Sequence, residues 1–402
     1  MTKIHEVLIV GGGAGGLASA ASLRKRDSKL DITVIEPAEK HYYQPGWTMV
    51  GAGVFDKEDT ERTMDSVWPA GINRIKDEVV SFDPDNSSLT LKSGKELSYK
   101  VLIVAPGLKL DWGAIEGLEE SLGANGVTSN YRYDLAPYTW ELVKSMSGKN
   151  AIFTQPPMPI KCAGAPQKAM YLSCDEWMKK NILKDINVAF CNAGPVLFGC
   201  AAYVPALMEY VKKYSINLDF GHNLVKIDGK SKKAWFTVAK EGAEPETIER
   251  SFDMIHVCPP QCAPDFIKES PLSNDAGWVD VDPASLQHTK YKNIYGLGDV
   301  CSTSNAKTVA AARKQAPIVA QNVISTLNET VPKIEYNGYG SCPLTVEKGK
   351  IILAEFGYGG KVMPTFNWDS TKPRRLAWIL KKSILPTVYW SLMLKGREWL
   401  TK

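Results

Sequence analysis

A glycine-rich segment near the amino terminus constrains the fold more than any other feature. Gly11, Gly13 and Gly16 fit the pattern G-x-G-x-x-G, between an apolar stretch at residues 6–10 and a helical pattern ending near residue 26. Glu36 stands 20 residues beyond Gly16, after a second apolar stretch. Such glycines let the backbone approach a pyrophosphate at a helix amino terminus, and the acid accepts hydrogen bonds from a ribose. The pattern predicts a parallel βαβ unit whose dinucleotide contacts are Gly11, Gly13, Ala14, Gly15, Gly16 and Glu36.

A second motif, far along the chain, indicates that this dinucleotide is FAD. The segment Tyr295-Gly-Leu-Gly-Asp299 lies between an apolar stretch and a helical pattern at residues 307–327. The acid can bond a ribityl chain, while the helix amino terminus near Lys307 faces the electron-rich side of a flavin ring. Two sites about 280 residues apart indicate a discontinuous FAD domain that holds a second domain. Further predicted FAD contacts are Gly298, Asp299, Lys307, Val79 and Gly107.

The alternation of apolar stretches and helical patterns predicts an α/β fold with two Rossmann-like domains. We expect residues 1–114 and 285–331 to form the FAD domain, residues 115–284 the inserted domain, and residues 332–402 a carboxy-terminal region. The inserted domain lacks a second glycine motif, because Pro195 and Phe198 occupy the turn after its strand at residues 187–191. We therefore expect this domain to resemble an NAD-binding domain without taking hydride from NAD(P)H.

The cysteines are too sparse for a secreted disulfide framework, with 8 in 402 residues. Cys258 and Cys262 have no matching pair and the chain holds only five His, so we expect no metal site. Cys162 and Cys342 stand in sharply turning segments rich in glycine or proline, and Cys342 is expected in a loop before a strand. A helix start and two lysines near Cys162 favour its thiolate. The residues alone leave a redox role and a packing role both open.

The carboxy-terminal tail combines positive charge with apolar side chains. From Lys372 onward it holds eight cations and one anion, in a chain whose formal net charge is only +4. Pro386 is expected to divide it into two amphipathic pieces that lie on a membrane lipid surface, rather than pack against the protein or a second copy. No apolar run is long enough to span a bilayer, and the first residues leave no room for a signal or transit peptide. We expect a peripheral, monotopic membrane protein that binds no nucleic acid.

Three segments, at residues 41–53, 160–172 and 339–356, resemble sulfide:quinone oxidoreductases, particularly the mitochondrial-type branch with two cysteines. The most specific parts are Pro159-Ile-Lys-Cys-Ala-Gly-Ala-Pro-Gln-Lys168 and Ser341-Cys-Pro-Leu344, and the resemblance extends over nearly the whole chain. It implies an FAD enzyme that oxidises hydrogen sulfide and reduces a membrane quinone. It also implies a small acceptor for the sulfur, such as glutathione or sulfite.

The resemblance further implies roles for individual residues. Cys162 and Cys342 would form a disulfide, with or without an extra sulfur between them. Hydrosulfide would attack Cys342 and leave a persulfide there, while the freed Cys162 thiolate passes electrons to FAD. Lys168, Glu120 and Lys382 are expected near the pair, with Lys381 as the alternative to Lys382, and Gln44 is expected along the flavin. An NADH:quinone dehydrogenase, a flavin redox sensor and a homo-oligomer remain open.

Overall fold

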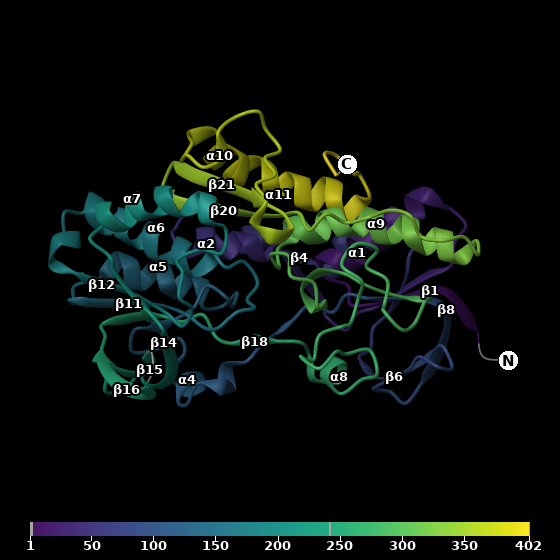
Figure 1. Ribbon diagram of the computed structural model, residues 1–402, viewed down its shortest axis with the longest axis horizontal. Helices are drawn as coiled ribbons and strands as arrows, with labels where there is room; N and C mark the ends of the chain where they lie inside the picture. The colour runs from purple at the N-terminus through teal and green to yellow at the C-terminus, as the bar shows by residue number, and fades with distance from the viewer. Residues whose placement is uncertain (1–2, 241–242, 402) are drawn as a thin grey trace.

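The computed structural model describes residues 3–240 and 243–401. Two sheets of mainly parallel strands lie toward opposite ends of the long axis, and the carboxy-terminal helices cover one side (Figure 1). The first sheet has the order β5-β2-β1-β8-β7-β6, and β19 pairs with β8. Its strands are β1 (Ile4–Val10), β2 (Ile32–Ile35), β5 (Asn73–Ile75), β6 (Val79–Asp83), β7 (Ser88–Leu91), β8 (Glu96–Val104) and β19 (Ile294–Gly296).

The first sheet joins distant parts of the chain, as the sequence predicts for a discontinuous domain. Tyr295 of β19 lies beside Ile103 of β8 in parallel register, although almost two hundred residues separate them. Helices α1 (Ala14–Arg26) and α9 (Val309–Leu327) pack against each other beside this sheet. Small buried residues such as Ala18 on α1 leave room for a close neighbouring helix.

The second sheet has the order β10-β17-β11-β12-β13, and all its strand pairs are parallel. Helices α6 (Ala165–Lys179) and α7 (Val204–Lys213) belong to this half. The α/β class with two Rossmann-like units is thus confirmed, whereas the exact domain boundaries stay a prediction. The strands are β10 (Val127–Thr128), β11 (Asn150–Gln155), β12 (Asn187–Asn192), β13 (Asn217–Phe220) and β17 (Met254–His256), and a separate antiparallel sheet holds β14 (His222–Asp228), β15 (Lys233–Lys240) and β16 (Ala243–Ser251).

The carboxy-terminal region differs from the sequence expectation in two ways. Cys342 lies inside β20 (Gly340–Glu347), opposite Ala354 of β21 (Lys350–Phe356), rather than in a loop before the strand. Pro386 does not divide the tail, because the chain stays helical from α10 (Arg375–Ile379) through α11 (Leu385–Thr387), with π-helical turns before and after α11. Pro386 lies inside this continuous helical stretch, at the junction between the π-helical turn at residues 380–384 and α11.

The end of the tail packs against the first domain. Tyr389, Met393 and Leu394 are buried in the same core as β1. Glu398 accepts hydrogen bonds from Ser22 and Arg26 of α1, at 2.5 Å each. This end of the tail therefore packs against the protein itself, rather than forming a detached helix that binds lipid. Across residues 3–240 and 243–401, no helix combines the length and the apolar character needed to cross a bilayer.

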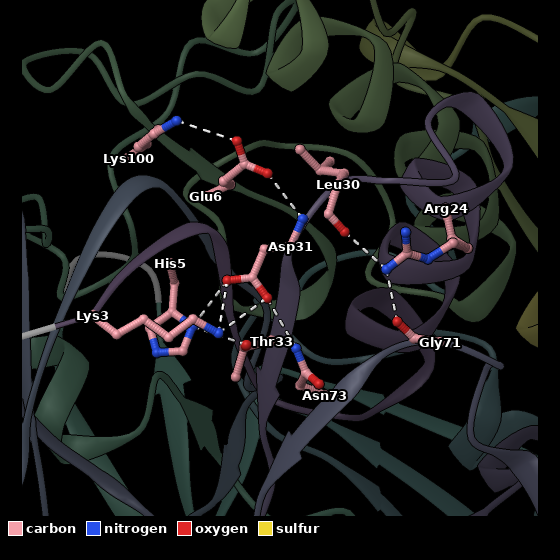
Figure 2. Close-up of polar contacts among 10 residues, drawn as sticks. All are labelled: Lys3, His5, Glu6, Arg24, Leu30, Asp31, Thr33, Gly71, Asn73 and Lys100. Atoms are coloured by element: carbon pink, nitrogen blue, oxygen red, sulfur yellow. Dashed lines mark hydrogen bonds and ion pairs between the residues drawn. The ribbon is translucent and has the colours of Figure 1, made fainter.

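The amino ends of β1 and β2 are held by polar contacts, which Figure 2 shows. Asp31 accepts hydrogen bonds from Lys3 at 3.3 Å and from Asn73 at 2.9 Å. Arg24, at the end of α1, donates to the backbone carbonyl groups of Leu30 at 2.8 Å and Gly71 at 2.7 Å. The amino ends of these strands lie at the opposite end of the sheet from the glycine turn. The contacts there therefore stabilise the fold rather than bind a ligand.

We expect Arg24→Ala to lower the free energy of unfolding by about 1–3 kcal/mol, because backbone carbonyl groups lose a charged donor. Urea denaturation monitored by circular dichroism measures the change. Lys29→Ala is the matched control, since its side chain is exposed nearby and none of the described hydrogen bonds uses its ammonium group. Equal stability of both variants would contradict this role of Arg24.

Candidate active site

A cavity of about 220 Å³ lies between the two Rossmann-like units and the carboxy-terminal region. The FAD-domain motif contributes Asp299 and Lys307 to its wall. The segment before α6 contributes Cys162, and the tail contributes Lys381 and Tyr389. The tail is therefore part of the cavity wall, and five predicted site residues line the same space, namely Gln44, Cys162, Lys168, Asp299 and Lys307.

The two predicted redox cysteines are in contact, with Cys162 lining the cavity and Cys342 buried next to it. Cys162 precedes α6 and Cys342 lies on β20, and their Sγ atoms are 3.2 Å apart. Gly164 makes this approach possible, since a Cβ atom there would lie 3.0 Å from the Cys342 Sγ and would overlap Leu344. Residues 180 positions apart are thus in direct contact.

The surroundings of the two sulfurs give them different charge states. The hydrogen bond from Cys342 holds the pKa of Cys162 well below its usual value, and the Lys168 ammonium, 3.2 Å from the Cys162 Sγ, acts in the same direction. The same contact and burial raise the pKa of Cys342. These opposite shifts favour the thiolate at Cys162 and the thiol at Cys342.

The structure places Lys381, and not Lys382, beside the pair. Lys381 is buried and lines the cavity, whereas the neighbouring Lys382 is exposed. Burial and repulsion by Lys168 lower the pKa of Lys381 to about 7. Successive side chains on a helix point about 100° apart, so Lys381 faces the cavity while Lys382 faces solvent. A one-residue uncertainty in the family resemblance is therefore enough to select the wrong lysine.

Two other predicted residues lie away from the cavity. Glu120 is exposed on the short helix α4 (Leu118–Ser121), and it does not line the cavity. Val79 begins β6 of the first sheet and its side chain is packed into the core at 6% exposure. Lys161 lines the cavity, but its ammonium donates to Gln44 Oε1 at 2.7 Å and does not bond the Cys162 sulfur.

The glycine turn has the shape that a dinucleotide requires. A side chain on Gly11, at φ +95°, would collide with the Ala105 carbonyl, and one on Gly16 would overlap the Gly11 carbonyl. Gly13 and Gly107, in contrast, face open space, as Gly298 does at the second motif. Tight turns beside open backbone form a cradle for a pyrophosphate. Gly15 is buried against Leu297, Ala14 begins α1, and Glu36 accepts from the Gly12 N–H at 2.7 Å.

Unpaired polar atoms in the cavity wall also fit a flavin. The indole N–H of Trp47, the hydroxyl of Thr48 and both amide atoms of Asn130 are buried without a hydrogen-bond partner, and all three residues line the cavity. Buried polar groups are normally paired, so these atoms fit the polar edge of a ligand. Gln44, Asp299 and Lys307 line the same space. Sequence reasoning missed Trp47, Thr48 and Asn130; the first two lie within the segment 41–53, whereas Asn130 belongs to no motif.

The turn after β12 leaves little room for a second dinucleotide. Its backbone is bound internally, since Asn192 accepts from the Gly194 N–H and donates to the Val196 carbonyl, each at 2.9 Å. Leu197 and Phe198 fold inward and are buried. Helix α7 begins only at Val204, so no helix amino terminus directly follows the strand.

The two Rossmann-like units and the dinucleotide cradle define a flavoprotein of the disulfide-oxidoreductase type, in which two cysteines lie in contact beside the cavity. The family model for pyridine nucleotide-disulphide oxidoreductases matches residues 5–138. The chain belongs to the sulfide:quinone oxidoreductase family, and its cofactor is FAD. It is 43% identical to the mitochondrial sulfide:quinone oxidoreductase of Dictyostelium discoideum, over 100% of this chain and 88% of that protein. Identity to the Mus musculus protein is 38%, over 98% of this chain and 87% of that protein.

Solved structures share the fold. The sulfide:quinone oxidoreductase of Aquifex aeolicus superposes with a TM-score of 0.80 at 21% identity, over 98% of this chain and 92% of that one. The NADH-bound NDH2 of Plasmodium falciparum is more distant, with a TM-score of 0.66 at 12% identity, over 98% and 99% of the two chains. These likenesses concern the fold alone.

Proposed function

We propose that this chain oxidises hydrosulfide through Cys162 and Cys342 and passes two electrons to a quinone. The observation that carries the proposal is the 3.2 Å contact between the two Sγ atoms. Cys162 lies in a cavity wall that also contains Asp299 and Lys307, and Cys342 is buried next to it. FAD, when bound, supplies a two-electron acceptor between the cysteines and the quinone. The glycine cradle, Asp299, Lys307 and Gln44 would hold it.

The first half of the reaction uses the unequal charge states of the two sulfurs. Starting from the disulfide between the two cysteines, hydrosulfide attacks the Cys342 Sγ. A sulfur–sulfur bond to Cys342 forms, the bridge breaks, and its electron pair stays on the Cys162 Sγ. The proton of hydrosulfide stays on the persulfide. Lys168, 3.2 Å from the Cys162 Sγ, stabilises the leaving thiolate.

The second half removes the sulfur and restores the bridge. A thiolate or sulfite attacks the outer sulfur of the Cys342 persulfide, leaves with it, and frees a Cys342 thiolate. The two thiolates re-form the bridge when they lose two electrons, and the quinone becomes a quinol after taking up these electrons and two protons. The cavity wall holds five cationic side chains, Lys161, Lys168, Lys307, Arg313 and Lys381, against the two acids Asp299 and Glu355, which favours anionic sulfur substrates.

Anaerobic mixing with sulfide, followed by decylubiquinone, tests the proposed activity. We expect sulfide to bleach the flavin absorbance and decylubiquinone to restore it over many cycles. A single cycle that sulfide cannot repeat would instead favour a redox sensor. We propose no oligomeric state for this protein.

An NADH:quinone dehydrogenase is the competing enzyme class. Because the turn after β12 is internally bonded and filled by Leu197 and Phe198, we expect NADH to leave the flavin oxidised under anaerobic conditions. Stopped-flow absorbance at about equal sulfide and NADH concentrations gives the comparison. We expect bleaching by NADH to be at least about 100-fold slower than bleaching by sulfide. Equal rates would favour the dehydrogenase.

We propose that the tail attaches the protein to a lipid surface through α10 and the turn after it. Leu376 and Ile379 are 61% and 50% exposed, and the adjacent cations include Arg375 and Lys382. Apolar side chains beside cations suit an anionic headgroup layer. Point substitutions are preferable to truncation, because residues beyond Ile379 line the cavity.

Replacing both Leu376 and Ile379 by Glu is expected to weaken binding to vesicles of phosphatidylcholine and phosphatidylserine at least about tenfold, since two apolar contacts are lost. Vesicle sedimentation measures this binding. The control replaces Val331 and Ile334 by Glu, because these are 74% and 40% exposed in the loop after α9. Equal losses in both variants would place the attachment elsewhere.

A further inference from the structure

The backbone at Cys162 has a conformation that its own sequence does not favour. Its φ angle is +83°, in the left-handed region that side chains other than glycine rarely adopt. Such a residue keeps this conformation only when its surroundings hold it. The contacts of the preceding residue, Lys161, therefore decide where the Cys162 sulfur lies.

Two buried side chains hold the backbone of Lys161 from both sides. Its N–H donates to the Oε1 atom of Gln261 at 2.7 Å. Its carbonyl accepts from the Tyr131 hydroxyl at 3.5 Å. Gln261 and Tyr131 are 8% and 4% exposed and come from different parts of the second domain, β18 (Gln261–Cys262) and the segment after β10. The segment before α6 is thus fixed by side chains distant in sequence.

The thiol of Cys258 completes this cluster. Gln261 donates through its Nε2 to the Cys258 Sγ at 3.7 Å, which orients the amide so that its oxygen faces Lys161. Burial raises the pKa of Cys258 to about 12, so this sulfur is a neutral thiol. Gln261 thus lies between Cys258 and Cys262, a pair that no metal or redox role explains. Both the oxygen and the nitrogen of its side-chain amide are hydrogen-bonded.

We propose that Gln261 is a positioning residue that holds the Cys162 sulfur within bonding reach of Cys342. This inference rests on the proposed redox role of the pair. The Cys342 sulfur is fixed independently by β20, so the distance between the sulfurs depends on the segment that Gln261 holds. Without the acceptor, the left-handed backbone relaxes and the two sulfurs meet less often. The disulfide then forms less favourably from the dithiol.

The test is the dithiol–disulfide equilibrium of the anaerobic holoenzyme in glutathione buffers, without sulfide. In this exchange the protein dithiol gives two electrons and two protons to glutathione disulfide, which becomes two glutathione thiols. Alkylation and peptide mass spectrometry measure the oxidised fraction of Cys162 and Cys342. We expect Gln261→Met to lower the equilibrium constant for disulfide formation about tenfold, while the melting temperature stays within about 2 °C of the wild type.

Matched variants separate positioning from packing. Gln261→Glu keeps the shape and the acceptor oxygen, so we expect it to retain an equilibrium constant within about threefold of the wild type. Cys262→Ser changes the next residue, whose sulfur bonds no part of the segment before α6, and it should match the wild type. If Gln261→Met does not fold, Tyr131→Phe removes the second contact, and we expect a decrease of about threefold.

The outcomes distinguish this inference from the function on which it rests. An unchanged equilibrium constant in folded Gln261→Met, or an equal decrease in Cys262→Ser, would overturn the positioning role while leaving the redox pair intact. Full sulfide turnover in Cys162→Ser would instead refute the proposed function, whatever the equilibrium constant.

Discussion

Replacing Cys162 or Cys342 by Ser is expected to lower sulfide-driven quinone reduction at least about 1,000-fold, because neither variant can form the bridge that sulfide opens. The two losses arise at different steps. Cys342→Ser keeps a thiolate-stabilising lysine beside Cys162 but has no sulfur on which to hold the persulfide. Cys162→Ser keeps the persulfide position but lacks the leaving thiolate. Decylubiquinone reduction, followed spectrophotometrically at saturating sulfide, measures both effects.

The control for these variants is Cys262→Ser, which removes a half-buried thiol that does not contact the pair. It should turn over at the wild-type rate. Flavin content measured on all three proteins separates lost chemistry from lost cofactor. Retention of more than about a tenth of the activity in either Cys162→Ser or Cys342→Ser would contradict the assignment of the pair.

Replacing Lys381 by Met is expected to slow sulfide oxidation in a pH-dependent way. The pKa of Lys381 is lowered to about 7, so its ammonium is charged below that pH and largely neutral above it. While charged, it favours the Cys162 thiolate, whose pKa it helps to lower. We expect Lys381→Met to reduce the rate about tenfold or more at pH 6 and to approach the wild type near pH 9.

The neighbouring lysine provides the control. Lys382 is exposed, so Lys382→Met should match the wild type across the whole range, measured as kcat/KM for sulfide. Iodoacetamide alkylation of the reduced proteins adds a second measurement, because loss of the Lys381 charge should raise the pKa of Cys162. An effect of Lys381→Met that is constant from pH 6 to pH 9, or one equal to that of Lys382→Met, would contradict the electrostatic role.

The parts of the site that depend on local chain geometry could be predicted from the sequence. The turn at Gly11–Gly16 lies between a strand and a helix that adjacent residues encode, and the motif ending at Asp299 directly follows β19. The family resemblance added the pairing of Cys162 with Cys342. No spacing rule predicts that contact, because the two residues meet only through the packing of β20 against α6.

The remaining residues could not be predicted because their roles depend on side-chain direction and tertiary packing. Lys381 and Lys382 have the same charge and adjacent positions, and only the rotation of the helix separates cavity from solvent. Asn130 belongs to no motif and becomes visible only as a buried amide without a partner. Pro386 suggested a break, yet the chain stays helical on both sides of it, with π-helical turns before and after.

The position of the persulfide sulfur shows which of the two cysteines hydrosulfide attacks. The holoenzyme is mixed anaerobically with one equivalent of sulfide, alkylated within the first turnover, digested and examined by peptide mass spectrometry. We expect one extra sulfur on the peptide that contains Cys342 and a simple alkylated thiol at Cys162. An extra sulfur found only at Cys162, or at neither cysteine while the flavin is bleached, would contradict this expectation.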